Sequence, residues 1–226
     1  MIPEWNSFIN ADCMQYLPEF PDNYFDLAIV DPPYGGVSQG GYAKNQMKGK
    51  NSVSKRWTDY DLSLWAQDAP SKEYFDQLRR VSKNQIIWGG NYYASLLTDS
   101  QCWIVWDKMK ADGVDFADAE LAWTSFNRAV RIFHYRWNGM LQGDMKNKEW
   151  KIHPTQKPVN LYLWCLERFA KEGDTILDTH VGSASSLISC HRSNHKYIGF
   201  EICENYYNMA RERLDAESAQ MNIFQY

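Results

Sequence analysis

Long apolar runs, paired cysteines and a basic leader are all missing from this chain of 226 residues. No run approaches the roughly 18 apolar residues that a membrane-spanning helix needs. The first residues, Met-Ile-Pro-Glu, also lack the basic and then apolar pattern of a secretory leader. We therefore expect a cytoplasmic protein that has no membrane partner.

The five cysteines form no C-x-x-C pair, and their odd number and scattered positions argue against a disulfide framework. Cys190, His191, His195 and Cys203 lie close together in the sequence, but their spacing matches no familiar structural zinc site, so we expect no metal. The H-x-E and P-C-x-x-C signature of zinc deaminases is also absent. No Pro-Cys dipeptide occurs, which argues against cysteine attack on a pyrimidine ring.

The net charge of −4 argues at first against a nucleic-acid partner, but the charges are segregated. Residues 32–58 carry a net charge of +5 without a single acid. Residues 121–158 also carry +5, from seven basic and two acidic residues. Two positive segments in an acidic chain suit a phosphate backbone, although two ordinary solvated loops would give the same charges.

Apolar periodicity predicts one domain over residues 1–226, built from alternating strands and helices. The expected strands are 26–30, 85–88, 102–106, 120–125, 130–137, 175–177 and 197–200, and the expected helices are 71–83, 158–171, 183–191 and 205–217. This alternation implies a mostly parallel sheet that is covered on both faces. Residues 35–58 have no apolar periodicity and are expected to form a long loop.

The sharpest chemical signal is Asp31-Pro32-Pro33-Tyr34 at the end of the first predicted strand. The amine of a nucleobase is a poor nucleophile because its lone pair is delocalised into the ring. A carboxylate and a rigid backbone carbonyl that accept its two N–H bonds would localise that lone pair. Tyr34 offers a flat face for a base that has left its stack. A proline-rich turn with a surface tyrosine is the plainer interpretation.

A second signal begins at Asp178, where a predicted strand enters a turn of small residues that contains Gly182 and Ser183. Backbone in such a turn can approach a nucleotide-like ligand closely. Glu201 ends the next predicted strand, where a carboxylate can hold ribose hydroxyls. The pair of motifs indicates a ligand that contains adenosine.

Together with His153-Pro154-Thr155-Gln156-Lys157-Pro158, these motifs resemble the DNA amino-methyltransferases whose catalytic motif precedes the cofactor motif, the beta group. Ile87 to Tyr92 and Trp103 to Ser125 resemble its prophage-type members. The resemblance covers nearly the whole chain. It implies a Rossmann-like, S-adenosylmethionine-dependent methyltransferase fold with a circularly permuted motif order, in which one seven-stranded, mostly parallel α/β sheet has its last strand antiparallel.

The resemblance also implies residue roles. Asp31, Pro32, Pro33 and Tyr34 would engage the target base. The residues that would hold S-adenosyl-L-methionine are Asp12, Cys13, Thr155, Gln156, Lys157, Asp178, His180, Gly182, Ser183, Phe200 and Glu201. Within this set, Asp178, Gly182 and Ser183 would border the methionine part. Residues 155–157 would lie near its carboxylate, Glu201 would bind the ribose, and Asp12 with Cys13 would lie beside the adenine ring.

Three positions depart from the commoner family pattern: Thr179 and His180 replace a Pro-Phe pair, and Ala184 replaces a glycine. These changes bear on cofactor affinity more than on activity.

The expected substrate is double-stranded DNA, methylated at the N6 amino group of adenine inside a bacterial or phage-infected cell. Residues 35–58 and 136–150 are the candidate DNA-recognition elements. The basic residues expected to contact DNA are Lys44, Lys48, Lys50, Lys55, Arg56 and Arg136. A homodimer would enlarge this small recognition surface.

Three alternatives stay open. The same cage can methylate the N4 amino group of cytosine, although Asp rather than Ser at position 31 favours adenine. Enzymes that methylate a protein glutamine or RNA carry related tetrapeptides, but they usually place the cofactor motif first. A non-catalytic DNA-binding module that retains the fold is the third, and Thr179, His180 and Ala184 prompt it.

The charge pattern predicts that neutralising Lys48, Lys50, Lys55 and Arg56 together weakens DNA binding. With fewer phosphate contacts, binding releases fewer counterions. The slope of log affinity against log salt concentration should therefore decrease in magnitude by roughly 0.9 per lost contact. Titrations of the variant and the parent protein at several salt concentrations measure this slope. An unchanged slope would exclude residues 35–58 as the clamp on the DNA backbone.

Overall fold

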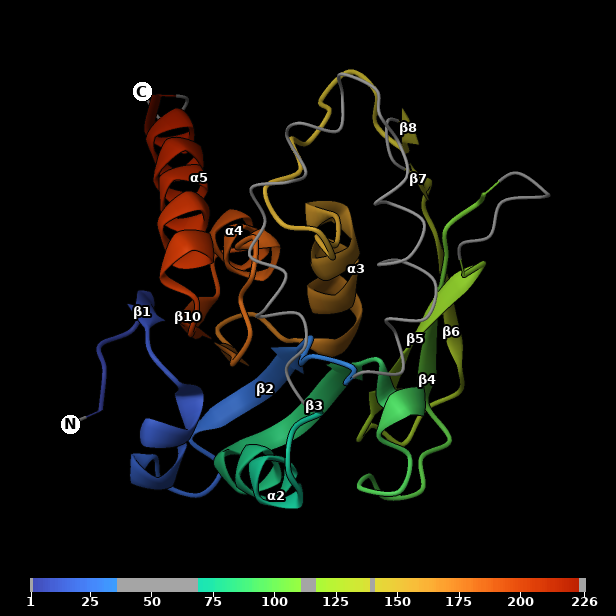
Figure 1. Cartoon of the computed structure of the whole chain (residues 1–226), viewed down its shortest axis with the longest axis vertical. Coiled ribbons are helices and arrows are strands. Elements are labelled where there is room, and N and C mark those ends of the chain that lie inside the picture. Colours follow the sequence, from blue (N-terminus) through green and yellow to red (C-terminus); the bar gives the residue numbers. More distant parts are fainter. Residues whose placement is uncertain (1, 36–68, 111–116, 139–140, 224–226) are drawn as a thin grey trace.

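The computed structural model describes residues 2–35, 69–110, 117–138 and 141–223, arranged as a sheet between layers of helices (Figure 1). The strands are β1 (Ser7–Asn10), β2 (Phe25–Val30), β3 (Ser82–Trp88), β4 (Trp103–Asp107), β5 (Ala119–Thr124), β6 (Arg131–His134), β7 (Trp137–Asn138), β8 (Leu141–Gln142), β9 (Thr175–Asp178) and β10 (Lys196–Glu201). The α-helices are α2 (Lys72–Val81), α3 (Val159–Phe169), α4 (Ser185–Arg192) and α5 (Glu204–Ile223), and the 3-10 helices are η1 (Cys13–Gln15), η2 (Leu17–Glu19) and η6 (Gly90–Tyr92). Among the residues described, no helix has the length and apolar character needed to cross a membrane.

The main sheet has the strand order β1-β10-β9-β2-β3-β5-β4-β6. All its pairings are parallel except those of β5, which runs antiparallel to both β3 and β4. The predicted fold class, an α/β sheet of Rossmann-like type, is confirmed. Among the described residues the main sheet has eight strands instead of the expected seven, because β1, which the sequence did not predict, pairs with β10. The antiparallel strand lies between β3 and β4, and β7 and β8 form a separate small hairpin.

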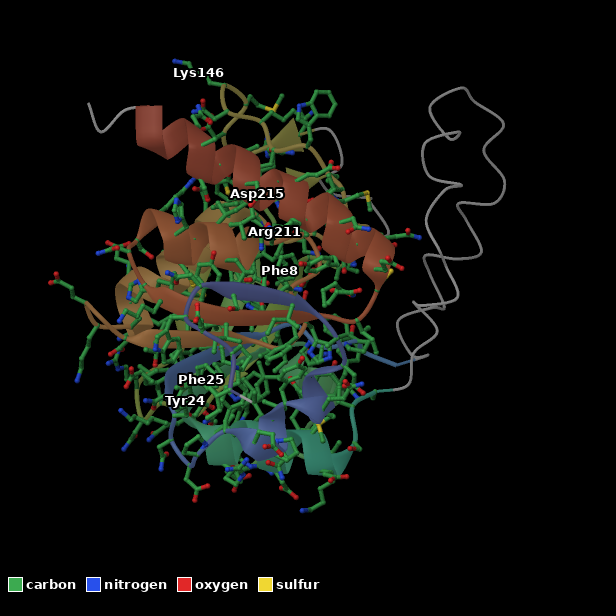
Figure 2. All side chains as sticks on the ribbon, turned by 90° about the vertical axis from the view of Figure 1, so that its left-hand side faces the viewer. Phe8, Tyr24, Phe25, Lys146, Arg211 and Asp215 are labelled. Atoms are coloured by element: carbon green, nitrogen blue, oxygen red, sulfur yellow. The ribbon has the colours of Figure 1, made fainter. Side chains whose placement is uncertain are left out.

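Two apolar cores cover the two faces of the sheet, as alternation along β2 requires. Leu27 and Ile29 face a core that includes α3, α4 and α5. Ala28 and Val30 face a core that includes α2 and η2. Figure 2 shows Phe8 of β1 between the sheet and α5, where its ring packs 4.6 Å from that of Tyr207. Both faces of the central strands are therefore shielded from solvent.

Local signals explain where most helices begin and end. Ser71 caps α2 by accepting a hydrogen bond from the Tyr74 amide. Pro158 precedes α3, and Gly173 adopts φ +83° shortly after that helix ends. The prediction of one strand over 130–137 was wrong, since the structure has two strands, β6 and β7, with a break at residues 135 and 136. The final helix begins one residue before the predicted start and runs six residues beyond the predicted end at 217.

Gly199 of β10 packs closely against Val181 and against Leu187 of α4. A Cβ atom at this position would lie 2.7 Å from Val181 Cγ2 and 2.9 Å from Leu187 Cδ1. We expect Gly199→Ala to lower the free energy of unfolding by about 1–3 kcal/mol through overpacking. Urea denaturation measures this loss. Val130→Ala, at an exposed position, serves as the control, and an equal loss in both variants would contradict the packing role of Gly199.

Candidate active site at the carboxyl ends of the central strands

The pairing of β2 with β9 divides the parallel sheet into two halves. Leu27 pairs with Ile176 and Ala28 with Leu177, while β2 connects onward to β3 on one side and β9 connects to β10 on the other. The chain therefore leaves these two neighbouring strands in opposite directions. In open α/β sheets, ligands bind in the crevice at the carboxyl ends of the strands at such a switch point. Asp31 and Asp178 stand at these two strand ends.

The turn after β2 is held by hydrogen bonds to the Asp31 carboxylate and to the carbonyl oxygens of Pro32 and Pro33. Asp31 Oδ1 accepts a hydrogen bond from the Tyr34 hydroxyl at 2.8 Å. The hydroxyl of Tyr93, which follows η6, lies 2.7 Å from the carbonyl oxygens of both Pro32 and Pro33, which share its single proton. Because each carbonyl oxygen has two lone pairs, Pro32 O retains one for a further donor.

Tyr34 belongs to an aromatic stack at the mouth of this site. Its ring lies 4.8 Å from the ring of Tyr92 at an interplanar angle of 17°. Tyr92 is 44% exposed and so covers Tyr34 from the solvent side. Gly89 makes room for the stack, because a Cβ there would lie 2.2 Å from Tyr34 Cε1, and its φ of +71° also disfavours a side chain.

Lys157 is buried at the centre of a row of partly buried charges. Its ammonium contacts Asp31 Oδ2 at 2.5 Å, the Tyr34 hydroxyl at 3.0 Å and Glu120 Oε2 at 3.0 Å. Glu120 in turn pairs with Lys108 at 2.5 Å. Burial raises the pKa of Asp31, the positive charge of Lys157 opposes that rise, and Glu120 adds to it. The charges alternate in sign along the row, which offsets part of the cost of removing them from solvent.

The second half of the site is the turn between β9 and α4. Asp178 Oδ1 accepts a hydrogen bond from the His180 amide at 2.9 Å, and Oδ2 accepts one from the Ser186 hydroxyl. Burial raises the pKa of Asp178 to about 7, with Asp31 and Glu201 adding to the rise. The three carboxylates at the ends of β2, β9 and β10 are therefore close enough to interact electrostatically.

Glu201 closes the turn from the end of β10. Its Oε2 accepts a hydrogen bond from the Gly182 amide, and its Oε1 accepts one from the Cys203 amide, both at 2.9 Å. The preceding residue, Phe200, is buried, and its carbonyl accepts the Val181 amide at 3.0 Å. Each carboxylate oxygen of Glu201 keeps a lone pair for a ligand hydroxyl.

Arg213 of α5 holds the same turn from outside. It donates to the Ser183 carbonyl at 2.6 Å and to the Ser185 hydroxyl at 3.0 Å, and it pairs with Glu149 at 2.6 Å. Arg213 could not be recognised from the sequence, because an arginine in the middle of a long polar helix carries no distinguishing signal.

The residues that depart from the family pattern have defined partners. Thr179 Oγ1 lies 2.6 Å from the Tyr74 hydroxyl and 2.9 Å from His180 Nδ1. Burial lowers the pKa of His180 to about 4, so this imidazole is neutral at pH 7. Ala184 adopts φ +62°, in the left-handed region that favours glycine. The turn between β9 and α4 is thus supported by hydrogen bonds at Thr179 and carries backbone strain at Ala184.

Asp12 and Cys13 lie beside this turn. Asp12 follows the end of β1 and caps η1 by accepting the Met14 amide at 2.9 Å. Its charge acts on His180 and on Cys13. Cys13 is buried in the core under α2, where burial raises the pKa of its thiol to about 12. The cysteine is therefore not a nucleophile at neutral pH.

The side chains of segment 155–157 have defined partners within the chain. The Gln156 side chain accepts the Ile152 amide at 2.9 Å and donates to the Trp150 carbonyl at 3.2 Å, so it stabilises its own loop. Thr155 Oγ1 lies 3.1 Å from His153 Nδ1. Lys157 donates a hydrogen bond to Asp31 Oδ2. The segment therefore connects the two halves of the site.

Among the residues predicted to contact DNA, Arg136 is exposed just before the β7–β8 hairpin, and its carbonyl accepts the Gly143 amide at 2.8 Å. Lys44, Lys48, Lys50, Lys55 and Arg56 lie outside the described residues.

A cavity of about 730 Å³ lies between β6 and α3, lined in part by Phe133, Tyr135 and Trp164, and no predicted site residue borders it. Within the described ranges, no group of three or more His, Cys, Asp or Glu side chains is placed to hold a metal ion.

Asp178 gives the stability of the protein a testable pH dependence. Its pKa is about 7 in the folded chain against an ordinary value of 3.8, so the stability it contributes is complete below about pH 4 and is lost as the pH rises through 7. Asp178→Asn avoids this loss. We expect the melting temperature of the variant to rise relative to the parent protein between pH 4 and pH 8. Asp99→Asn, at an exposed position, is the control, and a difference that does not change with pH would contradict the assignment.

Comparisons with known proteins agree with this geometry. A family model described as DNA methylase matches residues 103–212. The chain is 45% identical over 71 residues to the type II methyltransferase M.HpaI of Haemophilus parainfluenzae, an alignment that covers 31% of this chain and only 23% of that protein. It is 25% identical over 227 residues to the putative methylase YubD of Escherichia coli K12, covering 95% of this chain and 92% of YubD.

Solved structures share the fold. A putative DNA modification methylase from Thermus thermophilus, complexed with S-adenosyl-L-methionine, matches with a TM-score of 0.54 and 16% identity over 93% of this chain and 95% of that one. The cytosine-N4-specific PvuII DNA methyltransferase matches with a TM-score of 0.59 and 13% identity over 96% and 92%. Together with the motif order and the switch-point site, these similarities support a DNA amino-methyltransferase of the N6 or N4 type.

Proposed function

We propose that the chain is an S-adenosylmethionine-dependent DNA methyltransferase that modifies the N6 amino group of adenine in double-stranded DNA. The observation that carries this proposal is the position of Asp31. Its carboxylate ends β2 beside the tethered carbonyl of Pro32, and the carboxylates of Asp178 and Glu201 end the two neighbouring strands. An acceptor pair for an amine therefore adjoins a turn suited to an adenosine-containing donor.

The residues of the turn fit S-adenosylmethionine. Asp178 is a buried carboxylate without a cationic partner among the described residues, and it suits the ammonium group of the donor's methionine part. Glu201 retains lone pairs for the ribose hydroxyls, and the charge of Asp12 lies beside the same turn. When bound, the donor supplies a methyl group that is already activated as a sulfonium.

The protein's own residues then position and polarise the target amine. Asp31 and the Pro32 carbonyl accept the two N–H bonds, which localises the nitrogen lone pair toward the methyl group. Tyr34 supplies the face on which the extruded base rests. Asp178 and Glu201 are committed to the donor, so the base and the donor occupy adjacent halves of one cleft. We infer direct transfer without a covalent intermediate between enzyme and base.

Cytosine N4 methylation is the second candidate, and the structural similarity to the PvuII enzyme, which is cytosine-N4-specific, favours keeping it. Aspartate at position 31 favours adenine. The beta-group and prophage-type assignments, a single domain over residues 1–226, recognition by residues 35–58 and 136–150, a homodimer and a cytoplasmic location all stay predictions.

The activity is tested by incubating the protein with donor that carries a labelled methyl group and with mixed-sequence double-stranded DNA, followed by nucleoside analysis. We expect label in N6-methyladenine. Label in N4-methylcytosine would replace adenine with cytosine as the target. DNA binding without any label would favour the non-catalytic module and contradict the proposal.

Asp31→Ala should lower the rate of methyl transfer by about 100-fold or more, because it removes a principal acceptor for the amine. Donor affinity, measured by calorimetry, should stay within about threefold, because the proposed donor residues lie on other strands. Asp22→Ala removes an exposed surface carboxylate that pairs with Arg80 and serves as the matched control. Comparable turnover in Asp31→Ala and the parent protein would refute the role of Asp31.

A further inference from the structure

We propose that Lys157 is a positioning residue that, together with Glu120, orients the Asp31 carboxylate toward the target amine. This inference rests on the proposed function and deepens it. Lys157 is 3% exposed, and its ammonium bridges Asp31, Tyr34 and Glu120. Lys157 therefore links Asp31 and Tyr34, which would contact the base, to Glu120, which the sequence did not mark as part of the site.

Lys157 meets oxygen atoms of three residues. Its ammonium donates hydrogen bonds to Asp31 Oδ2 and to the Tyr34 hydroxyl, and it forms an ion pair with Glu120 Oε2 at 3.0 Å. The resemblance placed Lys157 near the carboxylate of the donor, but these three partners all lie on the Asp31 side of the site. The arrangement therefore favours a role for Lys157 beside the target base.

These contacts also orient Asp31. Oδ1 accepts the Tyr34 hydroxyl and Oδ2 accepts Lys157, so the carboxylate cannot rotate without breaking both bonds. Each oxygen keeps one further lone pair, and the direction of these lone pairs is fixed by the two bonds already made. An acceptor that is held in place loses little entropy when the amine arrives.

Glu120 has a distinct part in the arrangement. It comes from the antiparallel strand β5, and Lys108, just after β4, holds it from the far side at 2.5 Å. Without Glu120, Lys157 would interact with Asp31 alone and compete more strongly with the target amine. With Glu120 present, the ammonium is shared between two carboxylates. The row therefore balances two needs, an ionised Asp31 and an Asp31 that can still accept another bond.

The charge environment of Asp31 gives this role a measurable signature. The titratable groups that act on Asp31 or on its partners, from every neighbouring element, are Lys157, Glu120, Tyr34, Tyr93, Tyr162, Asp178, Lys108, Lys151 and His153. The positive charge of Lys157 is the largest influence that lowers the pKa of Asp31, and the negative charge of Glu120 raises it. Removing one or the other must therefore move the titration of Asp31 in opposite directions.

The experiment measures that titration directly in the full-length protein. Aspartate labelled with ¹³C at the carboxyl carbon is incorporated, and the Asp31 signal is assigned by its loss in Asp31→Asn. We expect the Asp31 midpoint to rise by roughly one to three pH units in Lys157→Met and to fall in Glu120→Gln. Lys83→Met removes an exposed lysine that pairs with Asp26 on the same strand β2 and should change nothing.

Methyl transfer at saturating donor and DNA supplies the second readout. The acidic limb of the kcat profile should move with the Asp31 midpoint in each variant, and kcat of Lys157→Met near pH 7 should fall roughly tenfold or more. Lys157→Arg keeps the charge and should keep the midpoint near that of the parent protein. If Lys157→Met does not fold, Glu120→Gln and Lys157→Arg still test the proposal, because their expected midpoints differ.

Two results separate the possible failures. Asp31 midpoints that stay unchanged in Lys157→Met and Glu120→Gln, in an enzyme that methylates DNA, would overturn the role of Lys157. Absence of methyl transfer by the parent protein would overturn the proposed function itself. A merely structural lysine would lower kcat at all pH values and leave the acidic limb where it is.

Discussion

The parallel pairing of β2 with β9 is the constraint on which the site depends. Residues 31 and 178 are far apart in the sequence, and only the register of Leu27 with Ile176 and Ala28 with Leu177 brings them to the same edge. Because β2 and β9 continue into opposite halves of the sheet, their loops diverge and leave room for a ligand between them. The apolar cores on both faces hold this register, since a slip of one residue would turn buried side chains outward.

A row of partly buried charges is the second constraint, and it links the end of β2 to β5 and to the end of β4. Asp31, Lys157, Glu120 and Lys108 alternate in sign from the end of β2 through the 153–158 segment and β5 to the end of β4. Loss of any one member leaves an uncompensated charge, which is far more costly than the pair is stabilising. By contrast, Asp178 has no cation beside it among the described residues, and its pKa of about 7 reflects that cost. Asp31 is thus paired with a lysine of the chain, whereas Asp178 has no such partner within the described residues.

Much of this arrangement could be predicted from the sequence, because its signals are local. Three motifs can each be recognised from a few consecutive residues: the apolar run before Asp31, the turn at Gly182 and the strand that ends in Glu201. The partnership of Lys157 with Asp31 could not be predicted, since it joins positions that only the sheet register brings together. Glu120 left one usable signal, a charged residue in a strand that continues into the buried Ala122 and Trp123. The four-residue strand β1 was not predicted, and it is too short to show a period.

A structure of the protein in complex with a non-reactive analogue of S-adenosylmethionine tests the central claim most directly. The account predicts that the analogue lies at the carboxyl ends of β9 and β10, with its ribose at Glu201 and the position of its methyl group facing Asp31 across the cleft. An analogue bound elsewhere, for example in the cavity between β6 and α3, or bound with its sulfur directed away from Asp31, would contradict the account.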